Sequence, residues 1–280
     1  MKRLHLIIFI VLLSGLTAGA KKHKQLVILH TNDTHSTIMP VNPKVDDKEI
    51  AGRGGYLRRV NMLKEQRQLH PDLMLFDSGD FSQGSGYYTL FKGEVEVRLM
   101  NEMGYDAVTI GNHEFDFGLD NLARIFRMAK FPIVCSNYDC TGTVLQDLVK
   151  PYITLVRNGV KIGVFALSPT LKGLVLDENC QGITYLDPAE TAQKYIDILR
   201  KQEKCDVVIC LSHLGWKESD YPDEMFIKKV EGCDLVLGGH THTYMRELEY
   251  APDKNGKLVP DDQNGKHGAF IGKLLLNLEK

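Results

Sequence analysis

Five short apolar segments of the sequence are each followed by Asp, Asn or His. Carboxylates, amides and imidazoles therefore recur at segment ends, and five of the chain's 10 His residues lie among them. The residues are Asp33, His35, Asp80, Asn112, His113, His213, His240 and His242. Any one of them alone is better explained as a turn, a cap or a hydrogen-bonded structural residue. Their joint recurrence indicates a shared site, because converging carboxylates and imidazoles repel or compete unless a cation binds them.

The donor types at this shared site suit divalent metal ions. Imidazole and carboxylate without thiolate favour Zn, Mn or Fe over Mg alone. About seven candidate ligands are too many for one ion, whereas two ions about 3.5–4 Å apart that share a carboxylate can use them. Asp80 is the natural bridge, because it is the lone carboxylate of its segment and lies between two other ligand-bearing segments. We therefore predict a binuclear metal centre.

The segments that must position these residues alternate between two kinds. Short runs rich in Val, Ile and Leu predict strands buried on both faces. They lie within 25–33, 72–80, 106–114, 131–137, 161–170, 206–215 and 234–242. Helical spacing occurs in 54–69, 94–103, 119–128 and 188–202. The alternation predicts an α/β protein with much parallel pairing, whose sites lie at the carboxyl ends of the strands.

The rest of the chain fits a single α/β domain. Asp187 and Pro188 predict the start of the last helix as its N-cap and first helical residue. The polar stretch 252–268 is interpreted as a long loop before a final strand in 270–280. We find no convincing linker between domains.

Composition excludes several classes of protein. The 280 residues contain 34 Lys and Arg against 36 Asp and Glu, a formal net charge of −2. With 43% hydrophobic and 25% charged residues, the chain has the profile of a globular protein rather than a disordered or collagen-like one. A nucleic-acid partner is not expected, because neutralising many phosphates requires a strongly basic surface.

The first 20 residues predict an export signal. Lys2 and Arg3 form a basic start, Leu6–Leu13 is an apolar run, and Ala18-Gly19-Ala20 is a small-residue cleavage site. The alternative is a membrane anchor, but the run is short for roughly 30 Å of hydrocarbon. We expect cleavage after residue 20, a periplasmic or secreted product, and no stable membrane insertion afterwards.

The six Cys residues leave the question of disulfides open. Cys135 and Cys210 lie within apolar runs, which favours buried free thiols. Cys205 and Cys233 each precede an Asp that opens an apolar run, so their thiols come within disulfide reach if those runs are neighbouring parallel strands. The absence of a Cys-x-x-Cys motif argues against a thiolate zinc site or a redox motif.

The motifs at the segment ends resemble those of the calcineurin-like binuclear metallophosphoesterases. In chain order they are Asp33-x-His35, Gly79-Asp80, Gly111-Asn112-His113-Glu114, His213 and Gly239-His240-x-His242. The sequences HTNDTH, GNHEFD and SHLG are most similar to the exported 5′-nucleotidase branch, and the match runs from about Gln25 to the C-terminus. The resemblance implies a four-layer α/β/β/α sandwich, with two mixed sheets face to face and helices outside.

The resemblance also implies a division of the ligands. The residues implied for the first metal are Asp33, His35, Asp80 and His242. Those implied for the second are Asp80, Asn112, His213 and His240. In the implied mechanism the two cations lower the pKa of a shared water, and the resulting hydroxide attacks the phosphorus of the ester.

The family pattern gives two further residues a catalytic role. His113 is implied to stabilise charge on the transferring phosphoryl group or leaving oxygen, oriented by Asp116. Asn112 and His113 are therefore also candidate substrate-binding residues. For Asp116 an alternative, compatible role is the N-cap of the helix that begins near Leu119. Tyr87 and Trp216 are candidates to line a substrate cleft, although partial burial explains both.

The predicted function is hydrolysis of phosphomonoesters, with nucleoside monophosphates as the favoured substrates. Full-length exported 5′-nucleotidases carry a C-terminal domain that binds the base, and we expect residues 21–280 to form the catalytic domain without it. A separate protein could supply that domain. The alternatives are a 2′,3′-cyclic nucleotide phosphodiesterase, a sulfur-ester hydrolase of the same branch, and a non-catalytic metal-binding subunit that needs such a partner.

Overall fold

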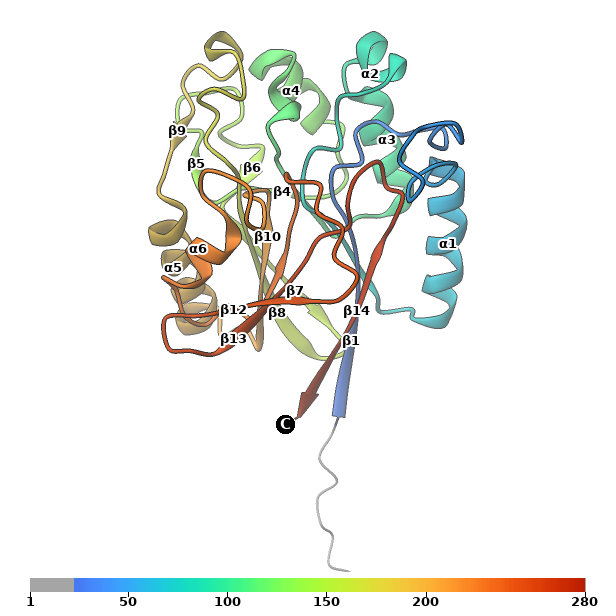
Figure 1. Cartoon of the computed structure of the whole chain (residues 1–280). Helices are drawn as coiled ribbons and strands as arrows, with labels where there is room; N and C mark the ends of the chain where they lie inside the picture. The colour runs from blue at the N-terminus through green and yellow to red at the C-terminus, as the bar shows by residue number, and fades with distance from the viewer. Residues whose placement is uncertain (1–22, 280) are drawn as a thin grey trace, which may run out of the picture.

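Two six-stranded sheets packed face to face form the centre of the molecule (Figure 1). The computed structural model describes residues 23–279, so the predicted signal segment 1–20 lies outside them. The first sheet has the order β14-β1-β2-β3-β4-β6. Its strands are β1 (His23–Thr31), β2 (Met74–Asp77), β3 (Ala107–Thr109), β4 (Ile133–Val134), β6 (Val149–Lys150) and β14 (Gly272–Glu279). All neighbours are parallel except β14, which runs antiparallel to β1.

The second sheet has the order β12-β13-β11-β10-β8-β7. Its strands are β7 (Tyr152–Arg157), β8 (Val160–Leu167), β10 (Val207–Ser212), β11 (Leu235–Leu237), β12 (Glu249–Pro252) and β13 (Leu258–Asp262). The central strands are parallel and the pairs at its two edges, β7 with β8 and β12 with β13, are antiparallel. A separate small ladder joins β5 (Tyr138–Asp139) to β9 (Thr184–Tyr185).

Helices cover the outer face of each sheet. They are α1 (Tyr56–Leu69), α2 (Gly86–Phe91), α3 (Glu94–Met103), α4 (Gly118–Phe126), α5 (Pro188–Asp197) and α6 (Asp223–Ile227). Short turns of other helix types are η1 (His113–Phe115), η2 (Asp177–Asn179) and a π-helical extension of α5, η3 (Ile198–Gln202). In Figure 1, α1 and α3 lie on one side of the molecule and α5 and α6 on the other. The predicted four-layer α/β/β/α sandwich is confirmed.

Three apolar cores hold the four layers together. The central one joins the inward faces of the sheets, for example Ile28 and Phe76 of the first with Val164 and Ile209 of the second. The outer two lie between each sheet and its helices. Strands β2, β10 and β11 are buried at every position, because side chains on both faces enter a core. This explains why their sequences are continuously apolar instead of alternating.

The predicted helices are all present, with ends within a few residues of those expected. Asp187 caps α5 as predicted, its side chain accepting the backbone N–H of Glu190, and Pro188 follows it. The short helix α2 was not predicted. It begins at Gly86, and the hydroxyl of its N-cap Ser85 accepts the N–H of Tyr88 at 3.2 Å.

The interpretation of 252–268 as a loop was wrong. This stretch contains β13, which pairs in parallel with β11, Val236 facing Asp261 and Leu237 facing Asp262. Both aspartates are buried. The strand was not predicted because a buried strand is normally recognised by an apolar run, and these two charged residues interrupt it.

The six cysteines are free thiols. Cys135 and Cys210 are buried, as predicted for unpaired thiols. Strands β10 and β11 are parallel neighbours as supposed, yet Cys205 and Cys233 do not form the disulfide that this arrangement was expected to permit. Among residues 23–279, no helix combines the length and apolar character needed to cross a membrane.

Candidate metal centre

The predicted ligands come from the ends of five strands in the two sheets. Asp33 and His35 follow β1, Asp80 follows β2, and Asn112 follows β3. The second sheet supplies His213 directly after β10, and His240 and His242 after β11. Parallel strands end at the same edge of a sheet, so the packing of the two sheets brings these residues together.

Six of the seven predicted ligands form two groups, each able to hold a cation. The first group is Asp33, His35 and His242, and the second is Asp80, His213 and His240, with the ligand atoms of each group within 4.8 Å of one another. In the first, Asp33 Oδ1 lies 3.8 Å from His35 Nε2 and 3.4 Å from His242 Nε2. In the second, His213 Nε2 lies 3.1 Å from Asp80 Oδ2.

The two groups are contiguous. His213 Nε2 of the second group also lies 4.0 Å from Asp33 Oδ1 of the first. Both groups therefore face one shared space.

The residues fit divalent cations, as their unsatisfied atoms indicate. Among the described residues, Asp33 Oδ1, Asn112 Oδ1 and His213 Nε2 are buried without a hydrogen-bond partner. Buried polar atoms are normally paired, and a missing ion is one reason for an exception. The Nε2 atoms of His35 and His242 lie 2.9 Å apart, pointing at each other as two ligands of one ion do. Each of these positions is suited to a bound cation.

Backbone carbonyls and amides fix the orientation of the ligands. Nδ1 of His213 lies 2.6 Å from the Ser78 carbonyl and donates to it, which leaves Nε2 free to bind a metal. His35 Nδ1 likewise donates to the Ser82 carbonyl at 3.3 Å, which leaves its Nε2 free to bind a metal. Asp33 Oδ2 accepts the N–H of His240 at 2.9 Å, so only Oδ1 remains for a metal.

Five of the predicted ligands have left-handed backbone conformations. The φ angles are +47° at Asp33, +42° at His35, +53° at Asp80, +75° at His240 and +55° at His242. Such conformations are uncommon outside glycine and cluster at functional sites. The chain thus bends sharply at each ligand to turn its side chain into the shared space.

Two glycines allow the ligand loops to approach one another. A Cβ at Gly111 would overlap the Asp80 carboxylate, and one at Gly239 would lie 2.9 Å from both His213 Nδ1 and the Ser78 carbonyl oxygen. Any larger residue at these two positions would separate the strand ends that carry the ligands.

Burial and charge set the protonation of the imidazoles. Burial lowers the pKa of His35 and lowers that of His240 to about 4, so both rings are neutral and able to donate a lone pair. Burial alone would also lower the pKa of His213, but the charges of Asp80 and Asp33 outweigh it and raise the pKa to about 10. His213 therefore faces enough negative charge to attract a cation.

Comparison with known proteins identifies the family. The sequence model of the calcineurin-like phosphoesterases matches residues 26–244, which include all seven predicted ligands. The chain belongs to the calcineurin-like phosphoesterase family.

Named relatives of this phosphoesterase act on nucleotides. The chain is 33% identical to the snake venom 5′-nucleotidase of Gloydius brevicauda, over 89% of this chain and 45% of that protein. It is 32% identical to the trifunctional nucleotide phosphoesterase protein YfkN of Bacillus subtilis, over 89% of this chain and 18% of that protein. The crystal structure of a 5′-nucleotidase precursor from Thermus thermophilus superposes with a TM-score of 0.80 at 27% identity, over 90% of this chain and 51% of that one. The chain spans about half the length of these relatives or less.

The phosphoesterase carries a His–Asp pair at the rim of the metal centre. His113 begins η1, and its ring centroid lies 5.5 Å from that of His35. Asp116 Oδ2 lies 3.2 Å from His113 Nδ1, the contact expected from their spacing. This hydrogen bond raises the pKa of His113 to about 8 against the effect of burial. The N-cap alternative for Asp116 was wrong, because α4 begins at Gly118 with Phe117 as N-cap and no side-chain cap bond.

Glu114 has a role that the sequence analysis missed. Its buried carboxyl accepts the backbone N–H groups of Asp80 and Ser82, both at 3.0 Å, and of Gly111 at 2.6 Å. These hydrogen bonds connect the loop after β2 to the loop after β3 and fix the backbone of Asp80, the candidate bridging ligand. Its position in the Gly-Asn-His-Glu motif was a signal, but the spacing alone did not distinguish it from a ligand or a cap.

The sequence analysis missed some residues near the centre and left the positions of others open. Asn32 donates to Asp33 Oδ2 at 2.7 Å, and the His267 ring lies 5.9 Å from that of His35 although His267 follows no predicted strand. Trp216, a candidate cleft residue, is buried in the core beside the second sheet. Tyr87 is 41% exposed and lines a pocket beside His35.

Proposed function

We propose that this chain is a two-metal phosphatase of the 5′-nucleotidase type, which releases phosphate from nucleoside monophosphates. The observation that carries the proposal is the convergence of two contiguous ligand groups beside His113. The family membership supports phosphoester hydrolysis, and the names of the relatives support a nucleotide substrate.

Each ion would be held by residues from both sheets. The first would be bound by Asp33, His35, Asp80 and His242, and the second by Asp80, Asn112, His213 and His240. When bound, two divalent cations neutralise phosphate charge and lower the pKa of a water molecule at the site. The imidazole and carboxylate donors favour Zn, Mn or Fe.

The chain's own groups would complete the catalytic arrangement. His113, on the rim and held by Asp116, would donate a hydrogen bond to the phosphoryl group or to the leaving oxygen as negative charge develops there. The Asn112 amide would bind a phosphate oxygen in addition to the metal. Trp216 and the other buried residues of the second core take no direct part.

Organisation and location form part of the same proposal. Residues 1–20 would be a cleaved signal and residues 21–280 the catalytic domain, active outside the cytoplasm. The two candidate ligand groups, drawn from residues 33–242, would all belong to this one domain. Nucleotide selectivity would come from this domain or from a further, base-binding domain.

A phosphate-release screen of residues 21–280 with Mn or Zn tests the proposal. The substrates would be nucleoside monophosphates, 2′,3′-cyclic nucleotides, sugar phosphates and an aryl phosphate. Hydrolysis of nucleoside monophosphates is the expected result. Preference for the cyclic esters would favour the phosphodiesterase alternative. Two metals per chain without turnover on any ester would contradict the proposal and favour the non-catalytic subunit.

A further inference from the structure

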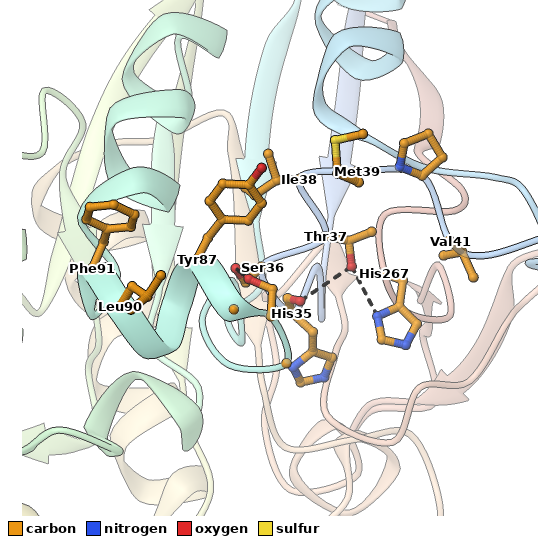
Figure 2. Close-up of a pocket in the computed structure, with 14 residues that line it drawn as sticks. His35, Ser36, Thr37, Ile38, Met39, Val41, Tyr87, Leu90, Phe91 and His267 are labelled. Atoms are coloured by element: carbon orange, nitrogen blue, oxygen red, sulfur yellow. Dashed lines mark hydrogen bonds between the residues drawn. The ribbon is translucent and has the colours of Figure 1, made fainter.

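A pocket of about 510 Å³ lies beside the metal centre, between α2 and the segment 36–41 (Figure 2). Figure 2 shows Tyr87, Leu90 and Phe91 projecting from α2 on one side, and Ile38 and Met39 on the opposite side. Pockets of roughly 300–1,000 Å³ are the usual size for small-molecule ligands.

The pocket borders the candidate metal centre. His35, a predicted ligand of the first metal, forms part of its wall, and His267 forms another part. His267 is held by a 3.1 Å contact between its Nδ1 and the Thr37 hydroxyl. A molecule whose phosphate binds at the metal centre could therefore extend its remaining part into this pocket.

The walls suit an uncharged, flat group. Among the described residues that line the pocket, none is Asp, Glu, Lys or Arg. Large apolar side chains remain exposed there, with Met39 at 65%, Leu90 at 75% and Phe91 at 49%. A cluster of exposed apolar side chains is a mark of a binding surface, whereas scattered ones are normal.

The opposite flank of the metal centre is a weaker candidate for the same group. A second pocket, beside His240, has a volume of only about 170 Å³. Its walls include Asp220, whose carboxylate would repel a phosphate ester. Size and charge both favour the pocket beside α2.

We propose that the pocket formed by α2 and residues 36–41 binds the ring of the substrate's alcohol portion, so that this domain itself selects phosphomonoesters whose alcohol carries a flat, apolar-faced ring. The inference deepens the proposed function and depends on it for the reaction. A nucleobase and a simple aryl group share this chemistry. Aromatic and apolar side chains would stack on or enclose either one.

The pocket can be tested by comparing esters with and without a ring. Adenosine 5′-monophosphate and phenyl phosphate carry one in the alcohol portion, and glycerol phosphate does not. We expect Tyr87→Ser and Leu90→Ser each to lower kcat/KM for a ring-bearing ester relative to glycerol phosphate by about tenfold, the scale of a lost apolar contact in a pocket. A larger loss for the nucleotide than for phenyl phosphate would identify a nucleobase as the preferred ring.

Matched controls separate the pocket from general surface effects. Tyr250→Ser replaces a tyrosine that is 51% exposed on β12, and Leu69→Ser a leucine that is 69% exposed at the end of α1. Neither lines the pocket. Both should leave the ratio of ring-bearing to ringless activity unchanged. Equal loss of activity on all three esters in the pocket variants would overturn the inference.

A binding measurement keeps this test independent of turnover. Calorimetry with phenylphosphonate and methylphosphonate on the metal-loaded protein should show tighter binding of the phenyl compound, and Tyr87→Ser should reduce that preference about tenfold. If wild type hydrolyses no ester but shows this preference, the proposed function fails and the pocket stands. If it hydrolyses esters without any ring preference, the pocket inference fails alone. Chain association that Tyr87→Ser abolishes, with no ring preference, would instead make this surface a protein interface.

Discussion

The two sheets contribute different chemistry to the metal centre. The first sheet delivers both carboxylates, the amide and the rim histidine, namely Asp33, Asp80, Asn112 and His113, together with His35. The second sheet delivers only imidazoles, from His213, His240 and His242. Neither sheet alone has a balanced set, since the first would hold repelling carboxylates and the second three imidazoles without a carboxylate. The site therefore exists only when the two sheets are packed together.

Contacts across the interface support this coupling. His213 of the second sheet bonds to the Ser78 carbonyl of the first, and the Ser78 hydroxyl donates to the Leu237 carbonyl at 2.7 Å. The backbone N–H of His240 bonds to Asp33. Because these bonds join the sheets at the ligands themselves, metal binding should also stabilise the packing of one sheet on the other.

The largest effect is expected at Asp80, the residue that we propose to bridge the two ions. Asp80→Asn removes the carboxylate that contacts His213 and would bridge the ions, so both metals should be lost. Elemental analysis should give fewer than one metal per chain, and activity should disappear. His242→Asn removes the one imidazole that the second sheet contributes to the first group. This variant should lose one of the two metal ions. Retention of two metals by the Asp80 variant would contradict the shared-carboxylate assignment.

His113 tests whether a residue of the first sheet can be essential without binding metal. His113→Ala should keep both metals and lower kcat by about 10²-fold or more, since it would remove a group that stabilises transition-state charge. Metal content and kcat are measured on the same preparation, with His70→Asn as a control far from the centre. A wild-type kcat would remove His113 from the mechanism, and loss of metal would make it a ligand.

These assignments were accessible from the sequence for a physical reason. A parallel strand buried on both faces is a continuous apolar run, and its carboxyl end is where a site must lie. The order and composition of the residues after such runs therefore predicted an α/β chain with a shared site at its strand ends, whereas the four layers and the division of the ligands were implied by the resemblance to a known family. The same rule could not find β13, because the buried Asp261 and Asp262 interrupt its apolar pattern.

What the sequence missed depends on contacts between distant segments. Glu114 is adjacent to His113, but its carboxyl group accepts hydrogen bonds from backbone N–H groups of the distant loop after β2. His267 lies 232 residues after His35 in the chain and approaches it only because the segment after β13 returns to the first sheet. The α2 pocket likewise requires residues 36–41 to face a helix that helical periodicity did not predict. Local patterns carry no information about such pairings.

Glu114 joins two ligand-bearing loops of the first sheet, so its substitution should weaken both. Glu114→Gln keeps the size of the side chain but replaces one oxygen by an NH2 group, so at least one of three backbone N–H donors loses its acceptor. We expect the free energy of unfolding to fall by about 1–3 kcal/mol, the cost of an unpaired buried donor, and metal affinity to weaken. Urea denaturation measures the first effect, with the exposed Glu102→Gln as control. Unchanged stability in the Glu114 variant would mean that other groups hold the two loops.

The smallest effect is expected behind the ligands of the second sheet, where Asp223 and Asp261 are both fully buried beside Gly238. Burial raises the pKa of Asp223 to about 7 and that of Asp261 well above its usual range, and the charge of Asp223 raises the latter further. Because the folded-state pKa values are raised, the stability that these groups contribute is present at low pH and is lost as pH rises toward them.

Asp261→Asn should therefore reduce the loss of stability between pH 5 and pH 8. Its amide donates to Asp223 without taking up a proton, and the loss should be smaller by about 1 kcal/mol, the scale of one pKa unit. Thermal unfolding at both pH values measures the difference, with the exposed Asp72→Asn as control. A steeper loss of stability in the Asp261 variant would contradict the expectation that a raised pKa of Asp261 causes the loss. An equal loss would show that the Asp223–Asp261 pair does not carry the pH dependence of stability.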